Sequence, residues 1–416
     1  MLTVAEASER ILAEIRTLGV ERVPLRQALG RVCAEDVVAT VTMPPWSNSS
    51  MDGYAVRSAD ITAVMSGERV SLKVVATIAA GGFAPRALRR GEAMRIMTGA
   101  PVPEGADSVI RKEDTDGGKK KVEIREARDV WKNIRQAGED FQRGDPLARR
   151  GNPLRPALLG VLASTGVAKV SVFKRPRVAI ISSGNELVEV DDFHKVEAGR
   201  KIVSTNGYTL TALTRVAGGI PLDLGIAGDT PASLKRKLRQ AKGCDLILTS
   251  AGVSVGDLDH TRDVFGALGG EQKFWKVKMR PGAPLAFGML DDVPWLGLSG
   301  NPVSAMVSFE LFVRPALRKM QGYATPFRRT VRVTLEEEVK TGAKLTHLLR
   351  AIVTRREDAS LTARLTGPQS SAALTSMAKA NALLIVPESS QKVAKGSQLN
   401  ALMLDQSLEE TSVFSL

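Results

Sequence analysis

The stretch that decides the fold is residues 245–257, which read Asp-Leu-Ile-Leu-Thr-Ser-Ala-Gly-Val-Ser-Val-Gly-Asp. The apolar run at 245–249 predicts a short buried strand. The glycines and serines that follow it predict a loop, and a helix is expected after the loop at 261–268. A buried strand that leads through a loop of small residues into a helix is typical of an α/β domain.

The same alternation continues on both sides of this stretch. Helices are expected at 206–216, where Gly218 and Gly219 would end the helix, and at 232–241, where Pro231 would take the first helical position. A longer helix is expected at 302–321, with a kink at Pro315. Further strands are expected at 177–182, 222–227, 274–279, 285–289 and 295–298. Residues 176–325 therefore predict a doubly wound, mostly parallel sheet with helices on both faces.

The rest of the chain predicts smaller units around this α/β domain. Helical spacing of Ala7, Ile11, Ile15 and Leu18 predicts an amphipathic helix at 1–18, within an N-terminal unit of residues 1–22 that packs on the α/β domain. Short β-rich runs between Gly and Pro predict two mainly β modules. The expected divisions are a β domain at 46–137, a mixed β module made of 23–45 and 138–175, and a C-terminal β-barrel-like domain at 326–416.

Composition narrows the class of partner. The 416 residues carry 58 Lys and Arg against 45 Asp and Glu, a net charge of +13 that favours anionic partners. The basic residues are scattered, no nucleic-acid motif accompanies them, and aromatics are only 4%, so we expect no nucleic-acid partner. Two cysteines, no signal peptide and no long apolar stretch predict a cytoplasmic protein with no membrane association.

Three stretches follow the predicted parallel strands, where ligands of open α/β sheets bind. They are residues 182–187, 250–257 and 299–304, and each combines glycine with serine hydroxyls. Glycine lets the backbone approach a ligand closely, and free N–H groups and a helix N-terminus attract anions. One such loop alone is equally well interpreted as a turn, but three at one edge predict a site for a phosphate-bearing small molecule.

Carboxylates gather near these loops, and they suggest a magnesium site. Glu186, Asp229, Asp257 and Asp259 offer the oxygen ligands that Mg²⁺ prefers. For Asp229 and Asp259 the alternative interpretation is a helix cap.

At this point the chain resembles the molybdopterin molybdenumtransferase family, which includes MoeA and the E domain of gephyrin. The resemblance rests on ordered motifs along nearly the whole chain. They are Ser-Met-Asp-Gly-Tyr-Ala-Val (50–56), Arg-Ile-Met-Thr-Gly-Ala (95–100), Gly-Glu-Asp-Phe (138–141), the loop 250–259, Met-Arg-Pro-Gly-Ala-Pro-Leu (279–285), Gly-Asn-Pro-Val-Ser-Ala-Met (300–306), and the tail pieces 367–371 and 377–382.

The resemblance implies a reaction. Molybdenum from molybdate would be inserted into adenylylated molybdopterin, and the adenylate would be hydrolysed with help from Mg²⁺ and released as AMP. It also implies a homodimer whose active site lies between the α/β domain of one subunit and a β domain of the other. A molybdopterin adenylyltransferase and molybdoenzyme-maturation proteins are the implied partners.

The resemblance also assigns roles by position in the motifs. On the catalytic side it implies Asp52, Thr98, Asp140, Glu186, Asp229, Asp259 and Arg280, with Glu186, Asp229, Asp257 and Asp259 as metal ligands. For substrate binding it implies Ser183, Gly184, Ser250, Gly252, Ser254, Gly256, Asp257, Pro281, Pro284, Gly300, Asn301, Pro302 and Ser304.

Some positions depart from the family pattern. Ala251 stands where the family usually has Gly, and Ala283 where it has Lys, so one expected cation is missing. Ser183, Asn185 and Ser299 replace the usual Thr, Asp and Pro. These changes are typical of a divergent member with reduced activity, or of a paralogue that binds or carries molybdopterin or the finished cofactor without efficient catalysis. Whether the metal is molybdenum or tungsten, and which enzyme accepts the cofactor, stay open.

Overall fold

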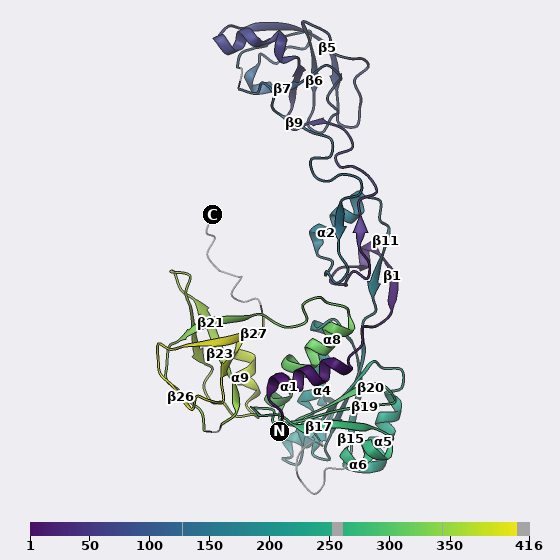
Figure 1. Cartoon of the computed structure of the whole chain (residues 1–416), viewed down its shortest axis with the longest axis vertical. Helices are drawn as coiled ribbons and strands as arrows, with labels where there is room; N and C mark the ends of the chain where they lie inside the picture. The colour runs from purple at the N-terminus through teal and green to yellow at the C-terminus, as the bar shows by residue number, and fades with distance from the viewer. Residues whose placement is uncertain (127, 252–260, 343, 406–416) are drawn as a thin grey trace.

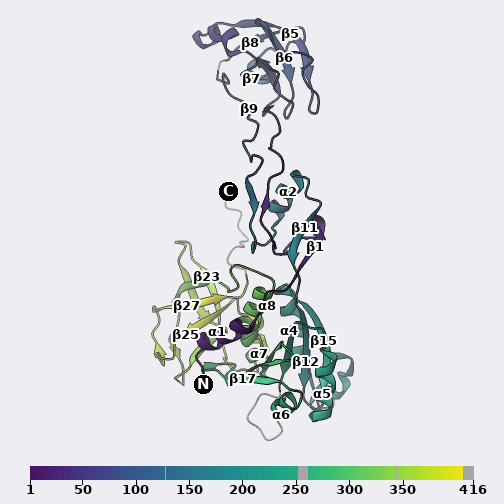
Figure 2. The same ribbon diagram turned by 45° about the vertical axis from the view of Figure 1, so that its right-hand side comes forward.

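The molecule is elongated, with units at its two ends joined by a small module in between (Figure 1). The computed structural model describes all residues except 127, 252–260, 343 and 406–416. The α/β unit and the C-terminal barrel lie together at one end, and a separate β unit lies at the other (Figure 2). The chain runs out to the far unit and back, so the middle module contains an outgoing and a returning segment.

The sheet of the α/β unit has the order β15-β12-β16-β20-β19-β17. The four strands β15 (Ile220–Ala227), β12 (Arg177–Ser183), β16 (Leu246–Ser250) and β20 (Val293–Leu298) run parallel. The last two, β19 (Pro284–Leu290) and β17 (Glu271–Lys276), are antiparallel. The expectation of a mostly parallel sheet is therefore confirmed.

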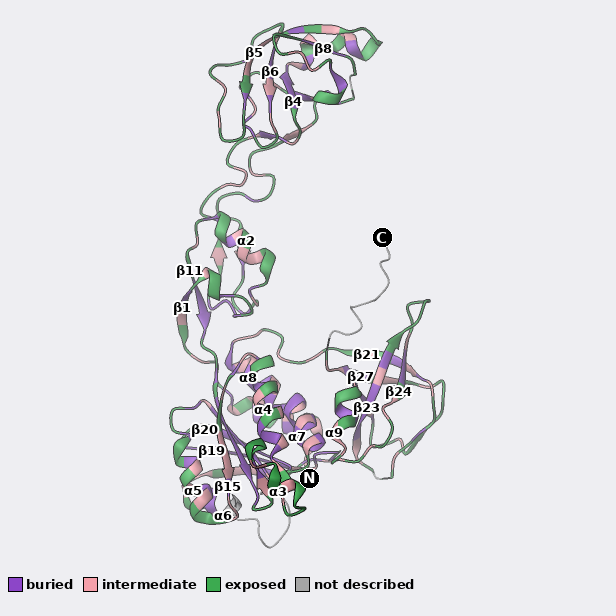
Figure 3. Ribbon diagram, turned by 180° about the vertical axis from the view of Figure 1, so that it is seen from behind, coloured by how far each residue is buried: buried purple, intermediate pink, exposed green. Residues whose placement is uncertain are grey.

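Helices cover both faces of this sheet because side chains alternate along the central strands. Val178 and Ile180 of β12 pack in one apolar cluster with α1, α4 and α7, whereas Ala179 and Ile181 pack in another with α5 and α6. These helices are α1 (Val4–Glu14), α4 (Thr205–Val216), α5 (Pro231–Gln240), α6 (Thr261–Ala267) and α7 (Pro302–Ser308). Buried residues run along the strands between the two helix layers (Figure 3). The doubly wound architecture follows from this alternation.

The N-terminal helix is shorter than the predicted span of 1–18. It ends at Glu14, and Val20–Pro24 instead forms strand β1, which pairs with β11 (Lys169–Phe173) in the middle module. Thr3 and Glu6 form a capping box that fixes the start of the helix. Its apolar face does pack on the α/β unit as expected, through Ala7 and Ile11. The apolar spacing through Leu18 suggested a longer helix, but Ile15 already has an extended conformation and the β-branched Val20 and Val23 belong to a strand.

Two further predictions needed correction near the cavity described below. The strand expected at 274–279 ends at Lys276, and Met279–Arg280 forms strand β18, which joins the C-terminal barrel instead. The helix expected at 302–321 is divided into α7, a π-helical turn at Phe309–Val313, and α8 (Arg314–Met320). Pro315 has no N–H to donate to the preceding turn, which explains the local widening at this point.

The far β unit is a five-stranded sheet with the order β7-β4-β6-β5-β8. The pair β3 (Asn48–Ser49) and β9 (Ile134–Arg135) lies at its edge next to the middle module. Its strands are β4 (Gly53–Val56), β5 (Val70–Ile78), β6 (Glu92–Ile96), β7 (Ser108–Arg111) and β8 (Lys121–Ile124). The middle module pairs β1 with β11, and β2 (Val37–Val38) with β10 (Pro146–Ala148), beside helix α2 (Pro156–Ser164).

The C-terminal unit is a closed barrel. Its sheet follows β18-β23-β24-β21-β27-β25, and an additional pairing between β23 and β25 closes the ring. The strands are β21 (Thr330–Leu335), β23 (Thr346–Arg355), β24 (Leu361–Leu365), β25 (Ala382–Val386) and β27 (Gln398–Met403), with β22 (Val339–Lys340) paired to β26 (Lys392–Val393) and helix α9 (Leu374–Lys379) alongside. The barrel-like expectation is confirmed. Among the described residues, no helix is both long and apolar enough to cross a membrane.

Candidate functional site

Three turns at the carboxyl edge of the parallel sheet line one cavity of about 670 Å³. Strand β12 ends at Ser183, β16 at Ser250, and β20 leads into Ser299 and Gly300. All four of these residues line the cavity, because β12, β16 and β20 are neighbours in the sheet and end on the same side. The sequence stretches that were expected to meet at one edge therefore do meet in their described parts.

A second cavity of about 640 Å³ adjoins the first and shares Pro284, Ser299 and Asn301 with it. Arg280 is an exposed cation in its lining, and Ser304 faces it from the start of α7. Pro281, which was also predicted to bind substrate, lines the second cavity beside Arg280. Pro302 lines only the first cavity. The barrel supplies the opposite wall, through Leu345, Gln369, Ser370 and Ser371. The two cavities together form a pocket between the α/β unit and the barrel.

The start of helix α7 offers fewer free donors than a helix N-terminus usually does. Pro302 has no N–H, and the N–H of Val303 donates to the carbonyl of Ser371 at 3.1 Å. Asn301 precedes the helix without a side-chain capping bond. The expectation that this helix end attracts an anion is thus weakened, and the hydroxyls and Arg280 are the stronger anion-binding groups in the described lining.

The turn after β12 is held by reciprocal hydrogen bonds with the turn before α5. Asp229 accepts from the backbone N–H of Asn185 at 2.9 Å, and its own N–H donates to the Asn185 side chain at 3.1 Å. The interpretation of Asp229 as a helix cap is wrong, because Thr230 caps α5 through the N–H of Ser233. Asp229 in this structure therefore orders the turn that carries Glu186.

Glu186 lies over the backbone of Gly184. A Cβ placed on Gly184 would come within 2.6 Å of both Glu186 carboxylate oxygens, and the φ of Gly184 is +147°. Only glycine allows this close approach in this backbone conformation. Glu186 also lines the first cavity, so its carboxylate is the described acidic group at the cavity wall.

The described residues alone do not form a metal site. They contain no group of three or more His, Cys, Asp or Glu side chains placed to hold an ion. Glu186 and Asp229 are described, but the other two predicted ligands, Asp257 and Asp259, lie outside the described residues. The predicted binding residues Gly252, Ser254 and Gly256 lie outside them as well.

Asp52 and Thr98 form a pair in the far β unit. The backbone N–H and the hydroxyl of Thr98 donate to the same Asp52 oxygen at 2.7 and 2.8 Å. Both bonds lower the pKa of Asp52, and the bond from the backbone N–H has the larger effect. The Asp52 carboxylate is therefore charged at neutral pH. Both residues are exposed, and in their own chain they lie at the opposite end of the molecule from the two cavities (Figures 1 and 2).

Asp140 lies in the returning segment, near the junction of the far unit with the middle module. Its N–H donates to the carbonyl of Met43 at 3.2 Å. The structure therefore brings Asp52 and Thr98 together but places Asp140 apart from both cavities within one chain.

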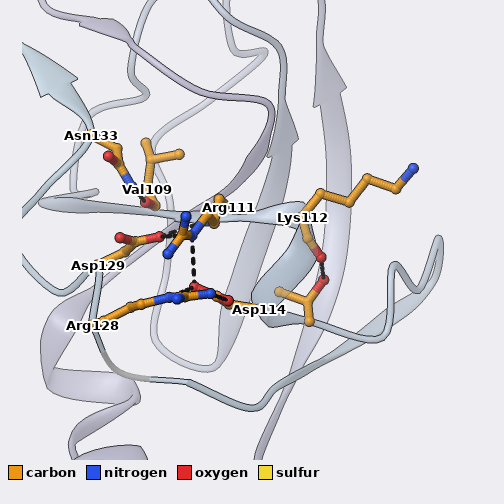
Figure 4. A network of polar contacts seen from close by, with 8 residues as sticks. Val109, Arg111, Lys112, Asp114, Arg128, Asp129 and Asn133 are labelled. Carbon is orange, nitrogen blue, oxygen red and sulfur yellow. Dashed lines mark hydrogen bonds and ion pairs between the residues drawn. The ribbon is translucent and has the colours of Figure 1, made fainter.

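Figure 4 shows an ion-pair network around the buried Asp114, which the sequence did not reveal. Asp114, with 2% of its side chain exposed, pairs with Arg111 at 2.9 Å and with Arg128. Arg111 also pairs with Asp129 at 3.2 Å. The hydrogen bond from Arg128 is the main reason that the pKa of Asp114 is lowered, and the bond from Arg111 adds to it. Burial of the carboxylate acts in the opposite direction and raises its pKa. The adjacent Lys112 N–H donates to the Asp52 carbonyl at 3.0 Å, so the network secures the segment to which Asp52 is attached.

Arg350 is a second residue that sequence reasoning missed. It is fully buried in β23, donates to Ser376 Oγ and to the Ser370 carbonyl at 3.0 Å each, and has no partner at Nη1 within the described part of the chain. Burial lowers the pKa of its guanidinium. Since Ser370 lines the second cavity, Arg350 places positive charge directly behind that cavity wall. An arginine inside the apolar run 348–353 was the available signal.

Three family profiles match consecutive parts of the chain. Residues 2–166 match the MoeA N-terminal region (domain I and II), residues 179–319 a probable molybdopterin binding domain, and residues 332–404 the MoeA C-terminal region (domain IV). The second match contains the three turns that line the first cavity.

Curated relatives and solved structures agree with these matches. The chain is 39% identical over 398 residues to molybdopterin molybdenumtransferase 2 of Mycobacterium tuberculosis, covering 94% of this chain and 97% of that protein. It is 33% identical over 413 residues to molybdopterin molybdenumtransferase of Staphylococcus aureus, covering 98% and 97%. The crystal structure of the molybdopterin biosynthesis MoeA protein of Pyrococcus horikoshii superposes with a TM-score of 0.82 at 29% identity, covering 97% of this chain and 100% of that chain.

Proposed function

The chain belongs to the molybdopterin molybdenumtransferase family, and from this premise we propose that it inserts molybdenum from molybdate into adenylylated molybdopterin and releases AMP. At the coarser level, it is a transferase of molybdenum cofactor biosynthesis. The substrates are a phosphate-bearing pterin and an oxyanion, both of them anionic, and the chain has a net charge of +13.

The observation that carries the proposal is the first cavity. Serine hydroxyls and backbone groups from three neighbouring strand ends face one space at the ligand-binding edge of a parallel sheet. A volume of about 670 Å³ is within the range of small-molecule sites. Ser183, Ser250 and the Gly300 backbone would hold the phosphate and pterin groups, and Glu186 would orient a water molecule or a polar substrate group.

The second cavity fits an oxyanion beside that substrate. Arg280 supplies a cation, Ser304 and Ser371 supply hydroxyls, and Arg350 keeps positive charge behind the wall. An oxyanion held by charged donors forms stronger hydrogen bonds than one held by neutral donors. We therefore place molybdate at this side, next to the wall that both cavities share.

A second subunit would complete the site. Asp52 and Thr98 are exposed and ordered, yet they lie far from their own cavities. A homodimer in which the far β unit of one chain reaches the cavity of the other would bring them to the substrate. Asp140, at the base of the same unit, would approach the site from the same chain as Asp52.

Magnesium remains part of the proposal, with Glu186 and Asp229 as the described candidates and Asp257 and Asp259 beyond the described residues. A bound divalent ion would neutralise charge on the adenylate phosphate.

The direct test is turnover. Purified protein supplied with adenylylated molybdopterin, molybdate and Mg²⁺ should release AMP, and the rate should fall when the metal is removed with a chelator. The Ser250→Ala variant is the matched comparison. It removes one hydroxyl from the first cavity, so its KM should be higher than that of the wild type. If AMP is not released while a Staphylococcus aureus relative releases it in the same assay, the proposal is rejected.

One observation favours a second function. Ala283 lines the second cavity, so a methyl group stands at the position where the family usually has a lysine. A protein that binds molybdopterin tightly without turnover would fit this loss of a cation. Calorimetry would then show binding without AMP release, and Ala283→Lys would restore turnover.

A further inference from the structure

One turn of chain at the start of α4 is attached to the ends of three neighbouring strands. Ser204 donates to Ser182 Oγ, at the end of β12, at 2.9 Å. Two residues later, the Asn206 amide donates to Ser250 Oγ at 2.5 Å and to the Gly300 carbonyl at 2.8 Å. Ser250 ends β16 and Gly300 follows β20, so the turn spans the edge of the sheet on which the first cavity is built.

Asn206 is buried, with 6% of its surface exposed, and it lines the first cavity. The orientation of its amide is fixed by chemistry. The Gly300 carbonyl can only accept, so the atom facing it must be the amide nitrogen, and Oδ1 points elsewhere. Replacement of Asn206 would therefore leave the Gly300 carbonyl and the buried Ser250 hydroxyl without their shared donor.

The bond to Ser250 also decides what that hydroxyl can do. A hydroxyl has one hydrogen to donate and can accept as well. Because Ser250 Oγ accepts from Asn206, its own hydrogen is left for another acceptor, and the nearest open space is the cavity that Ser250 lines. A hydroxyl that donates toward the cavity suits an anionic ligand.

We propose that Asn206 is a positioning residue for the transferase reaction, which fixes the Ser250 and Gly300 turns relative to each other and turns the Ser250 hydroxyl toward the phosphate of the substrate. This inference rests on the proposed function and adds a residue to it. Asn206 acts through Ser250 and Gly300 and does not itself take part in the chemistry. Packing of α4 on the sheet is a separate task, carried by apolar residues such as Leu210.

The test compares Asn206→Ala, Ser250→Ala and the double variant in the AMP-release assay with adenylylated molybdopterin. Loss of a hydrogen bond to a charged group predicts that each single variant raises KM by about tenfold. Because Asn206 acts partly through Ser250, the KM of the double variant should fall clearly short of the product of the two increases. A wild-type KM for Asn206→Ala, or fully multiplicative effects, would overturn the proposal.

Two further variants separate positioning from packing. Asn206→Asp keeps the shape but replaces the donor with an acceptor, so it should impair KM at least as much as Asn206→Ala, whereas a packing role predicts little change. Leu210→Ala removes buried apolar volume from the same helix, and it should lower the melting temperature while KM stays near wild type. If both Asn206 variants are unfolded where Leu210→Ala is folded, Asn206 is a folding residue and the proposal fails. Absence of AMP release by the wild type would instead reject the proposed function.

Discussion

Ala251 occupies a backbone conformation that alanine rarely adopts, directly at the first cavity. Its φ is +74°, in the left-handed region where a Cβ is unfavourable by roughly 1–2 kcal/mol. Ala359, in an exposed turn of the barrel, has a φ of +63° and so carries similar strain far from the cavity. The two alanines form a matched pair in which backbone strain and position in the site can be separated.

We predict that Ala251→Gly and Ala359→Gly both raise the free energy of unfolding by about 0.5–1 kcal/mol, because relief of strain outweighs the added entropy of the unfolded chain. Only Ala251→Gly should change the KM for adenylylated molybdopterin. Chemical denaturation and the AMP-release assay measure the two effects. Loss of stability in Ala251→Gly alongside a gain in Ala359→Gly would show that the Ala251 methyl group makes a packing contribution that exceeds its strain.

Asp114 gives a prediction about pH. The folded-state pKa of Asp114 is lowered, so its ion pairs stabilise the fold above the ordinary carboxyl pKa of about 3.9, and this stabilisation is lost as pH falls through the folded value. Asp114→Asn should lower the free energy of unfolding by roughly 1.5–3 kcal/mol at pH 7. The difference from wild type should shrink below about pH 4.

Calorimetric melting of both proteins between pH 7 and pH 3 would measure this. Glu123→Gln in the same unit is the control. It breaks the pairs with Arg69 and Arg125, whose side chains are 68% and 47% exposed, and should cost less than about 1 kcal/mol. A difference for Asp114→Asn that stays constant down to pH 3 would contradict the charge-based explanation.

At the residue scale, the sequence predicts what is local. Ser183, Ser250 and Gly300 could be placed in advance because each directly follows an apolar run, and strand ends of a parallel sheet share one edge. Asn206 and Arg350 could not be placed in this way. Asn206 reaches Ser250 across 44 residues and Gly300 across 94, and no periodicity in the sequence encodes such a contact.

At the element scale, β4 and β7 are held in an unusually close approach. A Cβ on Gly53 would come within 2.0 Å of the Ile110 carbonyl oxygen. Gly53 directly follows Asp52, so the position of that carboxylate depends on this strand pairing. Gly160, inside helix α2, has no atom within 4 Å of an added Cβ.

These two glycines should therefore respond in opposite directions to the same substitution. Gly53→Ala should destabilise the fold by at least about 1–3 kcal/mol through overpacking and should also lower kcat. Gly160→Ala should stabilise it by about 0.5–1 kcal/mol, because alanine is the better residue in a helix interior. Urea unfolding of both variants tests this, and a stable, fully active Gly53→Ala protein would refute the proposed link between β4 and Asp52.

Elements were predictable from the sequence where one pattern dominated. Alternating apolar residues and glycine or proline boundaries gave the parallel strands and helices α4 and α5 to within a few residues. Prediction failed where tertiary pairing decided the outcome. From the sequence, Met279–Arg280 was predicted to end the strand that starts at 274. Instead, these two residues pair with Thr346 and His347 of the barrel. This pairing links the α/β unit to the barrel beside the second cavity.

At the scale of the whole molecule, the separation of Asp52 from the cavities is the decisive feature. Sequence motifs could identify both regions but could not show that one chain holds them at opposite ends. The elongated shape arises because the far β unit is inserted between two segments of the middle module. The proposed homodimer, with an active site shared between two chains, would account for both regions.

Mixing two impaired variants at low substrate concentration tests this arrangement. Dimers that contain one Asp52→Asn chain and one Ser250→Ala chain would have one intact site if the site is shared between subunits, and none if it is formed within a chain. We predict that dissociation and reassociation of the two variants in equal amounts restores about a quarter of wild-type activity, since half of the dimers are mixed. At substrate concentrations well below KM, where a tenfold rise in KM lowers the rate about tenfold, each variant alone should show little activity. Absence of recovery in mixtures that contain mixed dimers would argue for a site within one chain.

The central claim is that the strand ends of the α/β unit form a cradle for a phosphate-bearing ligand, and a crystal structure of the protein soaked with AMP tests it most directly. We predict that the phosphate lies in the first cavity, within hydrogen-bond distance of the Ser250 hydroxyl and the backbone around Gly300. AMP bound elsewhere on the molecule, with this cavity filled only by water, would contradict the account.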